Sequence, residues 1–241
     1  MKNIIVLVDY ANLYITNTDD LTSVIDHIAD KITSHLQKKN QDEWAERSRL
    51  HFRLYDGWYE ESILTKKAQD IARIIDREYP SENEKLQRII LVELAKAQAS
   101  RPTFDLLHTF RRRKRLSHLR MCKITNACCE ASQGAIEYLK ELQTKGVCRR
   151  CDHKRPSSEL VWYDEQKLVD VMLSMDIAHF AMTDQYSEIA IVSSDDDFIP
   201  AMFQTASRGK SIIHINTKAH DRTHNYYRGI APRETYTELT F

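Results

Sequence analysis

The chain has 241 residues, 42% of them hydrophobic, and its 35 basic residues balance its 35 acidic residues, so the net charge is zero. This length and apolar content suit a large folded domain and exclude a wholly disordered chain. No run approaches the roughly 18 apolar residues of a membrane span. A strand begins at once at the N-terminus, without the regions of a signal peptide. We therefore expect a cytoplasmic protein with no membrane partner.

The first third of the chain predicts strands and helices in alternation. Asn3–Val8 is a nearly continuous apolar run, which is typical of a strand covered on both faces of a parallel sheet. A helical period follows over Leu21–Lys38. His51–Tyr55 predicts a second strand, which ends at an Asp-Gly turn signal. Helical spacing returns over Glu60–Glu78 and stops before a proline.

The middle of the chain predicts an insertion on the core. Glu82–Ala99 shows helical spacing, and we assign residues 82–115 to a helical, basic insertion. Ser117–Ile124 predicts the third strand, and a helix follows near Ser132–Thr144. Gly146–Ser158 is rich in Cys, Arg, Pro and Ser and predicts an ordered loop.

The last third returns to strands and helices. A long helix over Asp164–Ala181 precedes a fourth strand at Glu188–Ser193. A helix over Phe198–Arg208 is capped by a glycine, and Ser211–Asn216 predicts a fifth strand. This alternation predicts right-handed βαβ units, and therefore an α/β fold in which a central parallel sheet forms the middle layer of a three-layer sandwich.

Polar side chains gather where two of the predicted strands end and on the helix before the fourth strand. The set is Asp9, Asn12, Asp170, Asp176, Asp195 and Asp197. Carboxylates directly after such strands lie in the crevice where open α/β sheets bind ligands. Several acids in one crevice repel one another unless a cation lies between them. Because Mg²⁺ and Mn²⁺ prefer carboxylate oxygens and water, we expect one of these ions as the cofactor.

The spacing of the acids predicts which of them face the site. Asp170 and Asp176 are six residues apart, or about 600° around a helix, so they lie roughly 120° apart. We expect Asp170 to point into the site, and Asp176 to do so only partly or through water. Asp195 and Asp197 alternate about Asp196 and should point the same way. The alternative interpretation is that each acid is a helix N-cap or a solvated turn residue.

Four segments resemble the motifs of NYN domains, which are PIN-like nucleases. Val8–Asn12 (VDYAN) resembles their opening Asp-x-x-Asn motif, and Tyr55–Gly57 (YDG) resembles the ending of their second strand. Lys167–Asp176 (KLVDVMLSMD) resembles their Lys-x-Val-Asp helix with its second Asp. Val192–Phe198 (VSSDDDF) resembles their Ser-Gly-Asp-x-Asp-Phe block, with Ser194 where glycine is usual.

The resemblance implies a parallel sheet in the order 3-2-1-4-5 and metal-dependent hydrolysis of phosphodiester bonds, most often in RNA. We place this domain at residues 1–217, with a C-terminal extension over 218–241. The resemblance also implies four metal ligands, direct or through water: Asp9, Asp170, Asp195 and Asp197. Asn12 would orient water or phosphate, and Asp176 would support the metal from outside its ligands or serve a second metal.

We therefore expect a Mg²⁺- or Mn²⁺-dependent endonuclease that cuts RNA with metal-activated water and leaves a 5′-phosphate and a 3′-hydroxyl. Two alternatives use the same acidic pocket. One is a nucleic-acid-binding module that is catalytically silent, and the other is a phosphatase of small phosphate esters. The preference for RNA over DNA comes from the resemblance alone.

The cysteines suggest a structural zinc site within residues 122–153. Cys148 and Cys151 form a CxxC pair in a turn-rich loop, the arrangement that clips Zn²⁺ between two thiolates. Cys128 or Cys129 would supply a third ligand, and Cys122 or His153 could complete the set. The alternative is that these cysteines are reduced thiols without a metal.

A run of five cations follows Phe110: Arg111, Arg112, Arg113, Lys114 and Arg115. Although the net charge is zero, this segregation of charge could form a local phosphate-binding surface. We interpret the run as a nucleic-acid-binding patch, and the alternative is a solvated helix end.

Overall fold

The computed structural model describes residues 2–13, 20–39, 48–79, 83–85, 88–113, 134, 163–217 and 230–241. The chain forms two compact units, one of Met1–Phe110 with Gln166–Phe241 and the other of Arg111–Glu165. The first unit contains the central sheet and all six polar residues predicted to form the site. No helix among the described residues is long and apolar enough to cross a membrane.

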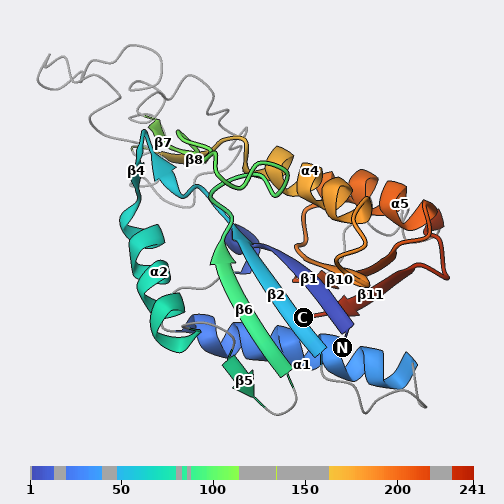
Figure 1. The fold of residues 1–241 in the computed structure, drawn as a ribbon. Helices are drawn as coiled ribbons and strands as arrows, with labels where there is room; N and C mark the ends of the chain where they lie inside the picture. Colours follow the sequence, from blue (N-terminus) through green and yellow to red (C-terminus); the bar gives the residue numbers. More distant parts are fainter. Residues whose placement is uncertain are drawn as a thin grey trace, which may run out of the picture. The chain divides into compact units, whose positions relative to one another are not determined.

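A seven-stranded sheet forms the centre of the first unit, in the order β11-β10-β9-β1-β2-β6-β5 (Figure 1). Its strands are β1 (Lys2–Asp9), β2 (Ser48–Tyr55), β5 (Asn83–Lys85), β6 (Arg88–Leu94), β9 (Glu188–Val192), β10 (Ser211–Asn216) and β11 (Tyr236–Thr240). All neighbours pair in parallel except β5, which runs antiparallel to β6. With β6 as the third strand, the segment from β6 to β10 has the predicted order 3-2-1-4-5.

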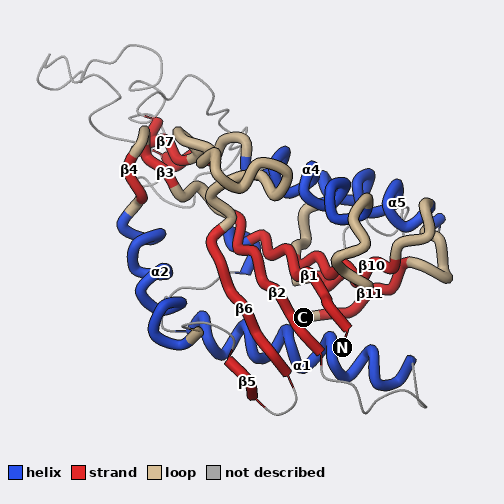
Figure 2. The backbone as a smooth tube through the Cα atoms, viewed as in Figure 1, coloured by secondary structure: helices blue, strands red, loops and turns tan. Residues whose placement is uncertain are grey.

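Helices cover both faces of this sheet, which confirms the three-layer α/β sandwich (Figure 2). They are α1 (Leu21–Lys39), α2 (Lys66–Glu78), α4 (Val169–Ala181) and α5 (Ile199–Ser207). Helices α1 and α2 pack on one face, and α4 and α5 pack on the other.

Strand β1 shows why the sequence needs a continuous apolar run here. Ile4, Val6 and Val8 belong to the core under α1 and α2, whereas Ile5 and Leu7 belong to the core under α4 and α5. Successive side chains of a strand point to opposite faces, so a strand between two helical layers must be apolar at every position. The same run therefore holds Asp9 rigidly at the end of the strand.

The predicted helix over Glu82–Ala99 is wrong, and the insertion 82–115 is not helical in its described part. Arg88–Leu94 is strand β6, paired in parallel with β2, and β7 covers Phe110–Arg113. Residues 89–92 are Ile-Ile-Leu-Val, and β-branched side chains have few rotamers in a helix but pack well in a sheet. Strand β6 takes the third place in the sheet, for which Ser117–Ile124 had been the predicted strand.

Several predicted segments lie outside the described residues. They are the strand Ser117–Ile124, the helix Ser132–Thr144 apart from Gly134, and the cysteine-rich loop Gly146–Ser158. Strands β1, β2, β9 and β10 and helices α1, α2, α4 and α5 match predicted elements, with differences at their ends, whereas the short strands β3 (Tyr59–Glu60), β4 (Ile63–Leu64) and β5 and the strand β11 were not predicted.

Two helices begin later than predicted, each for a local reason. Helix α2 begins at Lys66 because the Thr65 hydroxyl accepts a hydrogen bond from the Ala68 N–H at 3.2 Å and caps the helix. The short strands β3 and β4 precede it. Helix α4 begins at Val169 because Leu168 has a left-handed backbone, with φ of 68°.

Strand β8 (Tyr163–Gln166) occupies the start of the predicted long helix. At the other end of the chain, Tyr236–Thr240 forms β11 and pairs in parallel with β10. The segment assigned to a C-terminal extension therefore contributes the edge strand of the central sheet.

Candidate active site

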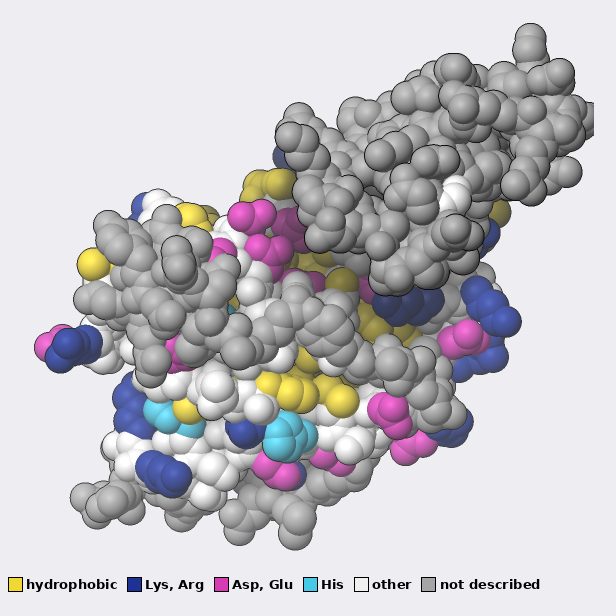
Figure 3. Space-filling view, turned by 180° about the vertical axis from the view of Figure 1, so that it is seen from behind, with side chains coloured by type: hydrophobic (Ala, Val, Ile, Leu, Met, Phe, Trp, Pro, Cys, Tyr) yellow, Lys and Arg dark blue, Asp and Glu magenta, His cyan; other side chains and the backbone are white. Residues whose placement is uncertain are grey.

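The sheet brings the ends of β1 and β9 to the same edge. These strands are parallel neighbours, with Val8 opposite Val192, so Asp9 and the segment that begins at Ser193 follow at the same level. Parallel strands end at one edge of a sheet, where open α/β folds bind ligands. Figure 3 shows Asp and Glu side chains gathered on one part of the face it presents.

Asp9 is buried and is held by neutral hydrogen-bond donors. Its side chain is 4% exposed. The Ser193 hydroxyl donates to Asp9 Oδ2 at 2.9 Å, and the Asn12 amide donates to the same oxygen. The 3₁₀ helix η1 (Tyr10–Leu13) directly follows β1 and turns Asn12 back toward Asp9. Asp9 and Asn12, both predicted to belong to the site, are therefore in direct contact.

The pKa of Asp9 reflects an unbalanced negative charge. Burial raises the pKa of Asp9, and the hydrogen bonds from Asn12 and Ser193 oppose that rise. The charges of Asp170 and Asp195 raise it further. Within the described part of the chain, no cation contributes to this balance.

Asp170 faces the same group of acids from helix α4. It lies in the first turn of the helix. Burial raises the pKa of Asp170, and the charges of Asp195 and Asp197 add to that rise. The structure thus brings Asp9, Asp170, Asp195 and Asp197 into one electrostatically coupled group, which we call the carboxylate group.

Asp195 also has a local structural role. Its Oδ1 accepts a hydrogen bond from the Asp197 N–H at 2.9 Å, so Asp195 caps the 3₁₀ helix η4 (Asp196–Phe198). The Asp195 N–H donates to the Ser193 hydroxyl at 3.0 Å, while Asp197 is exposed. The N-cap interpretation is therefore true of Asp195, in addition to its place in the carboxylate group.

The described carboxylates do not form a preorganised cluster of metal ligands. Within the described ranges, no three His, Cys, Asp or Glu side chains make a group that could hold an ion directly. The expected convergence on one shared ion is thus absent as a three-ligand cluster. The donor chemistry still fits Mg²⁺ or Mn²⁺, since Mg²⁺ usually takes one or two carboxylates and keeps several waters. Coupled carboxylates without a neighbouring cation are a setting that favours such an ion.

Asp176 belongs to a different network, which is buried at Asp176, Tyr55 and Arg53 and reaches the surface at Glu93. It is 1% exposed, accepts hydrogen bonds from Tyr55 Oη at 2.7 Å and from the Ala99 N–H at 2.9 Å, and lies 3.4 Å from an Arg53 nitrogen. Arg53 also binds Glu93 at 2.5 Å. Burial raises the pKa of Asp176, and the hydrogen bonds and the Arg53 charge oppose that rise. Asp176 is therefore separate from the carboxylate group, and its contacts with Arg53 and Tyr55 link α4 to β2.

A chain of two hydroxyls behind Asn12 was not predicted from the sequence. Thr217 Oγ1 donates to Ser194 Oγ at 3.1 Å, and Ser194 Oγ donates to Asn12 Oδ1 at 3.2 Å. With its oxygen held by Ser194, the Asn12 amide directs its nitrogen to Asp9. The signal for this arrangement was Ser194 itself, which stands where NYN domains usually have glycine.

A groove begins at the carboxylate group and continues between α4 and α5. Its volume is 600 Å³. It is lined by Asp170, Val171, Ser174, Met175 and Ala178 from α4, by Asp197, and by Pro200, Ala201 and Gln204 from α5. Two of the predicted site residues, Asp170 and Asp197, thus form part of its wall.

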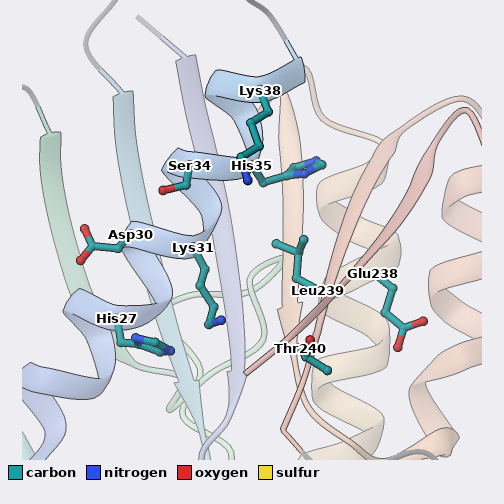
Figure 4. Close-up of a pocket in the computed structure, with 9 residues that line it drawn as sticks. All are labelled: His27, Asp30, Lys31, Ser34, His35, Lys38, Glu238, Leu239 and Thr240. Carbon is teal, nitrogen blue, oxygen red and sulfur yellow. The ribbon is translucent and has the colours of Figure 1, made fainter.

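A second cavity, of 440 Å³, lies between α1 and β11 (Figure 4). Its lining residues are His27, Asp30, Lys31, Ser34, His35, Lys38, Glu238, Leu239 and Thr240. None of the predicted site residues lines this cavity, and it includes both basic and acidic side chains.

The other predicted binding residues belong to the second unit or are not described. Arg111 and Arg112 are exposed on β7, which extends to Arg113. Lys114 and Arg115 lie outside the described residues, as do four of the proposed zinc ligands: Cys128, Cys129, Cys148 and Cys151. The phosphate-binding patch and the zinc site remain predictions.

Comparison with known families gives one match. The model of the NYN domain family matches residues 103–226, just over half of the chain. The matched region includes Asp170, Asp176, Asp195 and Asp197 but not β1, which carries Asp9 and Asn12. Searches of curated proteins and of solved structures gave no match.

Proposed function

This chain belongs to the NYN domain family of PIN-like nucleases, and on that premise we propose that it is a metal-dependent endonuclease with RNA as its substrate. The observation that carries the proposal is the carboxylate group. Burial and the other acids raise the pKa of both Asp9 and Asp170, and among the described residues the Asp9 carboxylate accepts hydrogen bonds from the neutral groups of Asn12 and Ser193 only. A divalent cation bound to such a group would relieve the repulsion between its negative charges.

The side chains of this group suit a hydrated Mg²⁺ or Mn²⁺ ion. Asp9 and Asp170 would hold it, and Asp195 and Asp197 would hold it directly or through water. When bound, such an ion supplies Lewis-acid stabilisation of a phosphate and an activated water nucleophile. Asn12 would orient that water or a phosphate oxygen, because Asp9 and Ser194 fix both ends of its amide.

The nuclease assay uses the purified chain with labelled RNA and DNA oligonucleotides of the same sequence, in Mn²⁺ or in EDTA. We expect cleavage of RNA in Mn²⁺, none in EDTA, and product ends with a 5′-phosphate and a 3′-hydroxyl. Asp9→Asn and Asp195→Asn should each lower kcat by on the order of 100-fold or more, as expected when a group that stabilises the transition state is lost. Both variants should keep the parental circular dichroism spectrum.

Asp184→Asn is the matched control, since this fully exposed acid lies beyond the end of α4, away from the carboxylate group. Parental rates in both Asp9→Asn and Asp195→Asn, or cleavage that survives EDTA, would contradict the proposal. Salt-sensitive RNA binding without turnover would instead identify a silent binding module. Preferential hydrolysis of p-nitrophenyl phosphate would identify a phosphatase.

A further inference from the structure

The groove between α4 and α5 joins a charged end to an apolar body. Asp170 and Asp197 form the charged end. Beyond them, Val171 and Met175 stay 58% and 51% exposed although both are apolar. Apolar side chains that remain exposed in a concave site beside a reaction centre indicate a ligand surface.

The charges of the groove decide what kind of ligand fits. Its lining includes two carboxylates and, among the described residues, no Lys or Arg. A phosphate group in the body of the groove would meet negative charge without a balancing cation. An uncharged, flat and weakly polar group is therefore preferred there.

The shape and the polar groups of the groove agree with a nucleobase. Its 600 Å³ volume is within the range of small-molecule sites, which is about 300–1,000 Å³. Ala178, Pro200 and Ala201 are small, so a ring can approach both helices. Ser174 and Gln204 offer a hydroxyl and an amide, and a glutamine amide can pair with the edge of a base.

The wall residue Met175 suits an aromatic ligand by its chemistry. The Gln98 amide, in the segment after β6, lies 3.3 Å from the Met175 sulfur. A flexible, polarisable thioether provides a surface against which an aromatic ring packs favourably.

We propose that this groove binds an unpaired nucleobase next to the phosphate that is cut, so that the substrate is single-stranded or locally unpaired nucleic acid. The inference rests on the proposed function, because the same strand must carry the base and the phosphate. Since Asp170 and Asp197 belong to both the groove and the carboxylate group, a base in the groove lies beside a phosphate at the carboxylates. A protein partner with an apolar segment is the competing occupant.

The test combines groove variants with substrates that lack one base. Met175→Ser removes apolar wall, Ala178→Leu narrows the groove, and Met182→Ser is the matched control, since Met182 is 71% exposed and does not line the groove. Each protein is assayed on an RNA oligonucleotide with one cleavage site, and on analogues with an abasic residue at successive positions around the cut.

We expect Met175→Ser and Ala178→Leu to lower kcat/KM on the intact RNA by about tenfold, the scale of one lost base contact. Met182→Ser should cut like the parent. When the abasic residue is at the position that the groove binds, the kcat/KM of the parent should also fall by about tenfold. The kcat/KM of the groove variants should fall little further on that substrate, because the variant and the abasic residue remove the same contact. Fully paired RNA should be cut more slowly than the single strand by every protein.

Additive losses, or parental cleavage by both groove variants, would overturn the inference while leaving the nuclease intact. If both groove variants cleave RNA like the parent, an apolar protein segment becomes the favoured ligand of the groove. If the parent cuts no nucleic acid at all, the proposed nuclease fails separately, and fluorescence anisotropy with the intact and abasic oligonucleotides tests the groove. Weaker binding of the intact RNA by Met175→Ser, but not by Met182→Ser, would then support the base site, and equal binding by all three would overturn it.

Discussion

Two carboxylates at nearly the same depth in this molecule, Asp9 and Asp176, have opposite surroundings. Asp9 is 4% exposed and Asp176 is 1% exposed. Asp176 lies beside the Arg53 guanidinium and accepts two further hydrogen bonds. In the part of the chain that the structure describes, Asp9 accepts hydrogen bonds from neutral groups only, and it faces the charges of Asp170 and Asp195.

The difference shows that burial alone does not identify a reaction site. A buried carboxylate with a cation and hydrogen-bond donors beside it can link two elements, as Asp176 links α4 to β2, although burial still raises its pKa. A buried carboxylate that faces further acids creates an excess of negative charge, which a bound cation can neutralise. Removing the cation beside Asp176 should therefore destabilise the fold, whereas removing the charge of Asp9 should stabilise the metal-free protein.

The largest effect on stability is expected when Asp176 loses the cation beside it. Arg53→Met leaves Asp176 buried without its cation, so the free energy of unfolding should fall by about 3–5 kcal/mol. Urea denaturation followed by circular dichroism measures the change. Arg73→Met is the matched control, because the exposed Arg73–Asp70 pair is worth only about 0–1 kcal/mol. Equal losses in the two variants would show that Arg53 does not balance a buried charge.

The second prediction concerns the unbalanced carboxylate in metal-free protein. The raised pKa of Asp9 means that the folded state binds its proton more tightly than the unfolded chain does. The stability that this provides is fully present below the ordinary value of 3.8 and is lost as the pH rises through the raised pKa. Asp9→Asn cannot ionise, so in EDTA at neutral pH we expect a higher Tm than that of the parent.

This gain in Tm should shrink as the pH falls toward 3.8, because the parent then holds its proton as well. Differential scanning fluorimetry across the pH range measures both values. A lower Tm for Asp9→Asn at neutral pH would mean that the Asp9 charge is compensated in the folded protein.

The smallest expected effect concerns the hydroxyl behind Asn12. Ser194→Ala removes the hydrogen bond to Asn12 Oδ1 without changing the backbone, and one such bond is worth about 0.5–1.5 kcal/mol. On the proposed function, kcat should fall by up to about tenfold with little change in KM. Thr217→Val, which removes the next hydroxyl in the chain, should have a weaker effect. Unchanged kcat in Ser194→Ala would mean that the Ser194 hydroxyl does not orient Asn12 for the reaction.

Much of the fold could be predicted because its signals are local. The apolar run of β1 and the helical period of α1 each lie within one segment, and parallel pairing of β1 with β9 brings Asp9 to Asp195. Strand β6 was misread because its apolar run, filled on both faces of the sheet, also satisfies a helical spacing.

The network of Asp176 could not be predicted from the sequence, because its partner Arg53 is 123 residues away. Arg53 lies between Phe52 and Leu54 in strand β2, and nothing in the local sequence indicates which acid it contacts. The mutual approach of the carboxylates also depends on how α4 packs on the sheet, which no local pattern specifies.

If the carboxylate group is a cation site, the metal-free protein should bind Mn²⁺, and titration in a calorimeter measures that binding. We expect the parent and Asp184→Asn to bind Mn²⁺ alike, and Asp9→Asn to bind it at least about tenfold more weakly, which corresponds to about 1.4 kcal/mol. Equal Mn²⁺ affinity in Asp9→Asn and the parent, or no binding by the parent, would show that the carboxylate group is not a cation site.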